Sequence, residues 1–106
     1  MGFVYLLGNF EQENIYKIGI TRKNIDKRIK QLQTGNSDEI FLLKFYETEY
    51  PFLIERFLHQ KFKVKNKKGE WFYLEPENVY NFEKICKDFE ETINSLKDNH
   101  FFKKIK

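Results

Sequence analysis

The chain has 106 residues, of which 41% are hydrophobic, 18% aromatic and 33% charged, and its formal net charge is +3. This length and apolar content fit one folded domain and exclude a disordered chain, while the single cysteine excludes an internal disulfide and a multi-cysteine zinc site. Because no apolar run approaches the roughly 20 residues of a membrane span and no secretion leader opens the chain, we expect a protein without membrane attachment. Its expected location is the cytoplasm, or the nucleus or host cytoplasm if it is viral.

The first two predicted elements are the strands of an antiparallel hairpin. Residues 3–7 form an apolar run that stops at Gly8 and Asn9, as a buried strand does. The alternation in residues 15–21 places apolar side chains on one face, namely those of Tyr16, Ile18 and Ile20. We expect the other face of this strand to look outward, with Lys17, Gly19 and Thr21.

A helix is predicted next, from a cap at Asn24 to about residue 33, before Thr34 and Gly35. Its apolar stripe runs through Ile25, Ile29 and Leu32. Arg28 projects along the edge of this stripe and not toward solvent, so its charge needs a partner. The alternative is an arginine whose stem packs against the stripe while its head reaches water.

Residues 40–49 are predicted to form a third strand, and Pro51 opens a second helix that runs to about Phe62. Glu55 and His59 lie one turn apart on the flank of this helix, beside its buried stripe. They are either an exposed pair of little energetic weight or part of a functional site.

A lysine-rich loop follows the second helix. Five lysines fall within eight residues, a density that favours contact with phosphate groups, and they are Lys61, Lys63, Lys65, Lys67 and Lys68. Arg22 is grouped with them as a candidate DNA contact, and the alternative is a solvated loop without a role. In residues 69–74, a predicted short strand or turn, Trp71 and Phe72 are better explained as packing anchors than as platforms for stacking bases.

Pro76 begins a long amphipathic helix that we expect to cover the sheet, and the basic and aromatic residues 97–106 follow as a tail. Strands and helices in this order predict an α+β fold with a small sheet, in one domain over residues 1–96. Residues 1–74 carry a net charge of +4 and residues 75–96 carry −4, so the basic surface is expected in the first part of the chain.

Five side chains could meet at one edge of this sheet, namely Tyr5, Lys17, Arg28, Glu55 and His59. Together they suit the cleavage of a phosphodiester. A carboxylate can hold a divalent cation that acts as a Lewis acid on the phosphoryl oxygens. A phenol or an imidazole can take a proton from water, and an arginine can clamp a phosphate with two hydrogen bonds.

Several short motifs stand in an order that resembles the GIY-YIG nuclease superfamily. They are VYLL at 4–7, KIGIT at 17–21, Arg28, QTG at 33–35, E-x-x-x-H at 55–59 and GEWF at 69–72. The closest resemblance is to the small branch of phages and fungi catalogued as a phage-type DNA-binding domain or as the meiotically up-regulated gene product type. It implies a three-stranded antiparallel sheet flanked by helices, and the cutting of a DNA strand with one divalent metal, Mg²⁺ or Mn²⁺.

The resemblance also implies roles for individual residues. Tyr5 matches the tyrosine of the first motif, and Lys17 stands where the second motif has its tyrosine. Arg28 matches the arginine of the helix. Glu55 matches the metal-binding glutamate, and His59 matches the histidine one turn later. We expect Tyr5 to be the general base, with His59 in support and Lys17 as its helper, because a nearby ammonium favours a phenolate.

The expected function is a metal-dependent DNA endonuclease of GIY-YIG type, because a pure binder would need only the basic surface. The alternative is a weakly catalytic or non-catalytic DNA-binding module on the same fold. It is favoured by Lys17 and by Phe3, which stands in place of the first motif's glycine. A protein-interaction domain that uses the acidic helix is a third interpretation. Since we expect no further recognition domain, sequence specificity would be loose or supplied by a protein partner.

Overall fold

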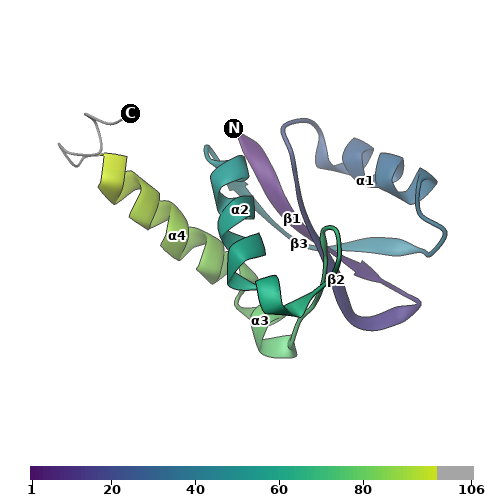
Figure 1. Ribbon diagram of the computed structural model, residues 1–106. Coiled ribbons are helices and arrows are strands. Elements are labelled where there is room, and N and C mark those ends of the chain that lie inside the picture. The colour runs from purple at the N-terminus through teal and green to yellow at the C-terminus, as the bar shows by residue number, and fades with distance from the viewer. Residues whose placement is uncertain (98–106) are drawn as a thin grey trace.

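The centre of the computed structural model is one antiparallel sheet with the strand order β3-β1-β2-β5-β4 (Figure 1). The structure describes residues 1–97. The strands are β1 (Gly2–Asn9), β2 (Gln12–Thr21), β3 (Ile40–Thr48), β4 (Asn66–Lys68) and β5 (Trp71–Tyr73). The α+β class is confirmed. The expected three strands form the core of the sheet, but the hairpin of β4 and β5 extends it beyond β2 to five strands.

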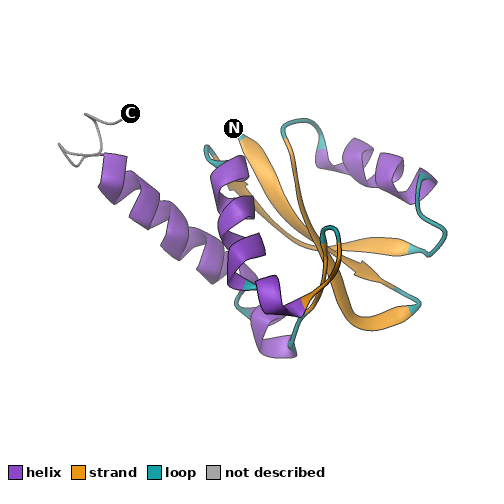
Figure 2. Cartoon of the chain, in the orientation of Figure 1, coloured by secondary structure: helices purple, strands orange, loops and turns teal. Residues whose placement is uncertain are grey.

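The helices follow the predicted caps in the first half of the chain. They are α1 (Ile25–Thr34), α2 (Pro51–Lys61), α3 (Pro76–Tyr80) and α4 (Phe82–Lys97). Asn24 caps α1, because its side-chain oxygen accepts a hydrogen bond from the N–H of Lys27 at 3.1 Å, and Pro51 occupies the first turn of α2. Only short loops join these elements in most of the chain (Figure 2).

The single long helix expected from Pro76 onward is wrong in one respect, because Asn81 separates two helices. A capping box of Glu75 and Asn78 starts the five-residue α3. Asn81 then closes α3, and its N–H still donates to the carbonyl of Glu77. Asparagine suits this position because its side chain competes with helical hydrogen bonding. α4 continues to Lys97, and the remainder of the predicted tail, residues 98–106, lies outside the described residues.

Both faces of the sheet are covered. On one face, Val4, Leu6 and Ile18 pack in a cluster with α2 and α4. On the other face, Tyr5, Leu7 and Ile40 pack against the apolar stripe of α1 and against Trp71. Figure 1 shows α1 on one side of the sheet and α2 with α4 on the opposite side. We call these the α2 face and the α1 face.

The expectation that Lys17, Gly19 and Thr21 look outward is therefore wrong for two of the three. Gly19 and Thr21 are buried and Lys17 is half-buried, because side chains of the α1 face, such as the Tyr5 ring over Gly19, cover this side of β2. No described helix has the length and apolar character that crossing a bilayer requires.

Candidate active site at the edge of β2

The candidate site lies where the outer edge of β2 loses its partner strand. β5 pairs with β2 only over residues 15–17. At Ile18 the main chain still makes two contacts, since its N–H donates to the carbonyl of Glu70 at 3.1 Å and its carbonyl accepts a hydrogen bond from His59 Nε2 at 3.0 Å. Beyond Ile18, none of the described strands pairs with this edge. Because no strand covers this edge, side chains of α2 can come close to side chains of the α1 face.

Tyr5 and Gly19 are direct partners across the β1–β2 ladder. The Tyr5 side chain is fully buried and passes over Gly19, where an added Cβ atom would lie 2.5 Å from the Tyr5 hydroxyl oxygen. Within residues 1–97 this hydroxyl makes no hydrogen bond of ordinary distance and angle, although the Arg28 side chain directs a donor toward it. An unsatisfied buried polar group costs about 1–3 kcal/mol, and such groups are rare in native structures. The orphan phenol therefore marks Tyr5 as a candidate functional group.

Arg28 reaches from α1 toward the same phenol. Burial raises the pKa of Tyr5 above its ordinary value, and Arg28 opposes this effect, first as a hydrogen-bond donor directed at the phenol oxygen and then through its positive charge, because both favour phenolate. Arg28 is itself half-buried, and its Nε makes no hydrogen bond to any described residue. The buried, unpaired nitrogen is Nε, and the guanidinium that contains it is close enough to Tyr5 to oppose the rise in the pKa of the phenol. The sequence analysis predicted that the charge of Arg28 needs a partner, and in the structure this partner is the Tyr5 phenol.

Glu55 and His59 come from the flank of α2, as predicted. The Ile18 carbonyl can only accept a hydrogen bond, so His59 Nε2 is the donor in this contact, and Nδ1 has no partner among the described residues. An edge contact with Phe72, at 4.9 Å between ring centroids, also orients the imidazole. Glu55 is half-buried, and its carboxylate accepts no hydrogen bond and forms no ion pair within the described part of the chain.

Burial is the main reason that the pKa of Glu55 is raised, and the negative charge of Glu70 adds to it. The positive charges of His59 and Lys17 oppose the shift. Glu55 also acts on Tyr5, where its charge raises the pKa of the phenol. These mutual effects place Tyr5, Arg28, Glu55 and Glu70 within electrostatic reach of one another.

Lys17 was expected to assist Tyr5, but in the structure it forms an ion pair with Glu70. Its Nζ lies 2.9 Å from Glu70 Oε1 and 5.8 Å from the centre of the Trp71 ring. The cation that lowers the pKa of Tyr5 is Arg28, and Lys17 acts instead on the carboxylates of Glu55 and Glu70.

Sequence reasoning assigned no role to Glu70, although it lies inside the quoted GEWF segment. The signal that could have identified it is its position beside Trp71, which pairs with Lys17 across the β2–β5 ladder.

The residues present fit a divalent cation of the magnesium type. Mg²⁺ is usually held by one or two carboxylates together with water and substrate phosphates. Glu55 offers an unengaged carboxylate, and Glu70 offers a second one nearby. No group of three or more metal-ligating side chains occurs among residues 1–97, so the described chain offers two carboxylates and not a closed cage.

The lysine-rich segment is not a single loop. Lys61 ends α2, Lys63 and Lys65 lie in a 3-10 helix, and Lys67 and Lys68 belong to β4. These elements turn the five side chains to different sides of the molecule.

Two of the five lysines lie away from the site, one borders the site itself, and two border a neighbouring cavity. Lys61 borders a hollow formed with α3 and α4, and Lys65 pairs with Glu75 at 3.5 Å. Lys63 borders a hollow that also contains Glu55 and His59.

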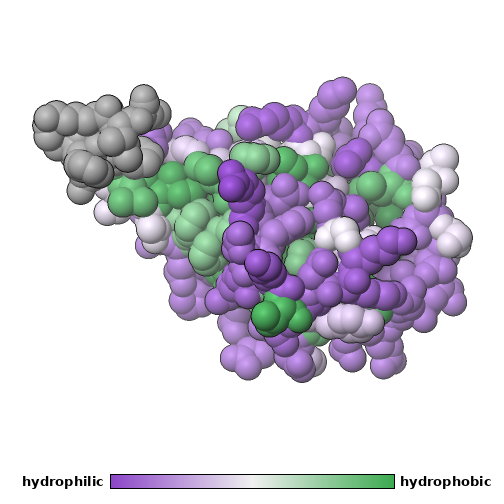
Figure 3. Space-filling view, in the orientation of Figure 1, coloured by the Kyte–Doolittle hydropathy of each residue, from purple (hydrophilic) through white to green (hydrophobic). Residues whose placement is uncertain are grey.

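Lys67 and Lys68 border a second cavity together with Trp71. Arg22 is exposed at the end of β2, next to Gly2. In Figure 3 the side of the molecule around α2 and the β4–β5 hairpin is mostly hydrophilic, whereas apolar side chains gather where α2 meets α4.

Comparison with known proteins gives one positive result. The model of the T5orf172 domain matches residues 2–94 of the chain. No curated protein and no solved structure matches.

Proposed function

Since the chain belongs to the T5orf172 domain family, a GIY-YIG-like, phage-type family associated with nuclease and DNA-binding domains, we propose that it is a metal-dependent endonuclease that cuts a strand of DNA. The observation that carries this proposal is the orphan hydroxyl of Tyr5, buried beside Arg28 and within electrostatic reach of Glu55. A domain that only bound DNA would have no use for a buried phenol and a buried guanidinium nitrogen left without partners.

Arg28 binds the scissile phosphate. Its guanidinium presents two parallel N–H donors to two phosphoryl oxygens, a geometry that a lysine cannot reproduce. The substrate oxygens then supply the hydrogen bonds that Arg28 lacks in the free protein. The same contact compensates the negative charge that grows on the phosphoryl group during the reaction.

Tyr5 is the general base. In the free protein burial keeps the phenol protonated, and the charge of Arg28 reduces that preference. The phenolate takes a proton from water while the water oxygen bonds to phosphorus and the bond from phosphorus to the leaving sugar oxygen breaks. The proton that the phenol loses to become phenolate passes to solvent, and the leaving sugar oxygen takes up a proton from solvent water, so that the net reaction consumes one water molecule. His59 is held by the Ile18 carbonyl, and its unpartnered Nδ1 can take up and release a proton during these transfers.

Glu55, with Glu70 next to it, would hold the divalent cation. When bound, the cation would act as a Lewis acid on the phosphoryl oxygens and would favour the ionised forms of nearby groups. Lys17 holds Glu70 in place through the 2.9 Å ion pair, and its positive charge opposes the rise in the pKa of Glu55, so it favours two carboxylates that lie close together.

The direct test is the nicking of supercoiled plasmid. The purified protein is incubated with plasmid in Mg²⁺ or Mn²⁺, and parallel samples contain an excess of chelator. We expect open-circular DNA with metal and none with chelator. The Tyr5→Phe and Glu55→Gln proteins prepared in the same way exclude a contaminating nuclease, because both should be inactive.

A weakly catalytic DNA-binding module is the second candidate, and Lys17 in place of the motif tyrosine favours it. Salt-dependent binding to plasmid, with no nicking in any metal between pH 6 and pH 10, would establish this second function and reject the first. Absence of both binding and nicking would reject the two together.

A further inference from the structure

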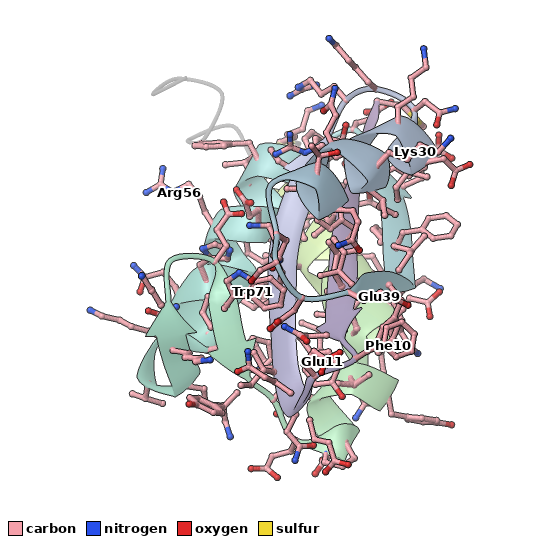
Figure 4. The ribbon with its side chains drawn as sticks, turned by 90° about the vertical axis from the view of Figure 1, so that its right-hand side faces the viewer. Phe10, Glu11, Lys30, Glu39, Arg56 and Trp71 are labelled. Carbon is pink, nitrogen blue, oxygen red and sulfur yellow. The ribbon has the colours of Figure 1, made fainter. Side chains whose placement is uncertain are left out.

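A second cavity lies on the α1 face, next to the candidate active site. It is an open hollow of about 150 Å³ between β2, the β4–β5 hairpin and the loop that leads from α1 into β3. Its wall includes one aromatic ring, two lysines and three polar side chains, namely Trp71, Lys67, Lys68, Asn9, Gln12 and Asp38. Figure 4 looks onto this face and shows Trp71 between α1, marked by Lys30, and the β1–β2 turn, marked by Glu11.

Trp71 and its neighbour Phe72 have different surroundings, although both were expected to be packing anchors. Phe72 is 1% exposed and belongs to the core of the α2 face. Trp71 points to the opposite face, where it packs against the cluster of Tyr5 and Leu7 but stays partly exposed and borders the cavity. An indole with one side supported by the core and another open to a cavity is a platform for a flat ligand.

The polar side of the cavity is arranged in advance. Asp38 Oδ2 accepts hydrogen bonds from Asn9 Nδ2 and Gln12 Nε2, each at 3.1 Å. Gln12 Oε1 accepts in turn from Lys67 Nζ at 2.6 Å. These donors lower the pKa of Asp38 and keep it ionised. Asp38 Oδ1 accepts no hydrogen bond from any described residue, so it remains available to a donor on a ligand.

The cavity also stands at a useful distance from Tyr5. Trp71 pairs with Lys17, and Gly19, the partner of Tyr5, lies two residues farther along β2. Two residues along β2, at about 3.3 Å each, and one strand spacing of about 4.8 Å place the main chain of Trp71 roughly 8 Å from that of Gly19. This is a span of two or three nucleotide rises of about 3.4 Å, so a DNA strand whose phosphate lies at Tyr5 can place a nearby nucleotide at Trp71.

We propose that this cavity binds one unpaired base of the DNA strand. The base stacks on Trp71, an amino group on its edge donates a hydrogen bond to Asp38, and the flanking phosphates contact Lys67 and Lys68. This inference rests on the proposed action on DNA and adds a preference to it. Cytosine, adenine and guanine carry the amino group that Asp38 can accept, and thymine does not.

The test uses the fluorescence of Trp71, the only tryptophan in the chain. The protein is titrated in chelator, so that nothing is cut, with fluorescein-labelled dC12 and dT12 single strands and with a duplex. Anisotropy of the label reports binding, and tryptophan emission is measured in separate titrations with unlabelled DNA. We expect dC12 to quench the emission of Trp71 by about half or more and to bind about tenfold more tightly than dT12, and the duplex to bind with little quenching.

Asp38→Asn and Glu39→Gln form a matched pair of variants that each remove one negative charge from the same loop. Asp38→Asn should abolish the preference for dC12 over dT12, and exposed Glu39→Gln should keep it. Binding by anisotropy without quenching of Trp71 would overturn the base site and leave the proposed function standing. An unchanged dC12 preference in Asp38→Asn would also overturn it. Absence of binding to any DNA would reject the proposed function and this inference with it.

Discussion

The hydroxyl of Tyr5 lies over Gly19, its partner on the neighbouring strand, so closely that a methyl group on Gly19 would be 2.5 Å from the hydroxyl oxygen. Real Cβ atoms do not approach other atoms this closely, so glycine is the residue that lets the phenol reach the edge of β2. The presence of Gly19 in the second motif is thereby explained by the side chain of the first motif. The Tyr5–Gly19 pair therefore matters both for the proposed catalysis and for the packing of the sheet.

Gly19→Ala should therefore damage both stability and activity. We expect a loss of about 1–3 kcal/mol in the free energy of unfolding, because the added methyl group must displace the Tyr5 ring in a packed layer. Plasmid nicking should fall at least 100-fold. Gly35→Ala is the control, since its Cβ would meet its nearest neighbour, the Leu32 carbonyl oxygen, at an ordinary 3.9 Å. Wild-type nicking by Gly19→Ala would show that the phenol need not occupy this position.

Tyr5→Phe should separate catalysis from stability. The change removes a buried hydroxyl that has no hydrogen bond, so the melting temperature should stay the same or rise, while nicking falls about 10²- to 10⁴-fold. Tyr46→Phe should do the opposite, because the Tyr46 hydroxyl donates to Glu90 at 2.7 Å far from the site. We expect it to lose about 1 kcal/mol of stability and keep its activity. Normal nicking by Tyr5→Phe together with an inactive His59→Ala would make the histidine the base.

Glu55→Gln should be more stable than the wild type at neutral pH. The folded protein raises the pKa of Glu55, so folding disfavours its carboxylate form. This cost is fully present above the folded pKa and disappears as the pH falls below the ordinary glutamate value of about 4. The difference in melting temperature between the two proteins should shrink accordingly.

The same variant tests the cation site without an activity assay. Millimolar Mg²⁺ should raise the melting temperature of the wild type, because a ligand that binds only the folded state stabilises it, and should raise that of Glu55→Gln much less. Glu91→Gln, a change at an exposed position on α4, should respond to Mg²⁺ as the wild type does. An equal response of all three proteins would exclude Glu55 as a ligand.

Arg28→Lys should lose most of the nicking activity despite its retained charge. One ammonium cannot replace the two parallel donors of a guanidinium, so we expect a fall of about tenfold or more in nicking rate with little change in DNA affinity. Lys27→Gln removes a whole positive charge from the exposed neighbouring position and should cost less. If Arg28→Lys nicks at the wild-type rate, the phosphate clamp is wrong.

Lysine substitutions should show which side of the molecule binds DNA. Changing Lys63, Lys67 and Lys68 together to Gln should weaken DNA binding and lower the slope of log K against log salt by about three units, since each phosphate contact releases close to one counterion. Lys61, Lys84 and Lys87 changed to Gln remove the same charge, and Lys61 and Lys84 border the hollow between α2 and the α3–α4 pair. We expect that control to leave the slope nearly unchanged. Equal effects of the two triples would indicate a diffuse charge effect.

The sequence by itself was sufficient for features that depend on neighbouring residues. The alternation in residues 15–21, the Asn24 cap and Pro51 predicted β2, α1 and α2 close to their observed bounds, because local hydrogen bonds and side-chain periodicity determine them. The order of the motifs also predicted that Tyr5 and Arg28 are neighbours, and the structure places the Arg28 side chain close enough to act on the pKa of Tyr5.

Only the tertiary structure decided what covers each surface. Whether the Tyr5 ring lies over Gly19, whether β5 adds to the sheet beside Lys17, and whether Glu70 pairs with that lysine depend on contacts between segments that are up to 58 residues apart, from Ile15 to Tyr73, which no local pattern encodes. The division of the lysine run arises in the same way, because a helix end, a 3-10 turn and an edge strand aim successive side chains in different directions. A run of like charges in a sequence predicts attraction to phosphate, but the elements that carry the charges decide which of them can reach it.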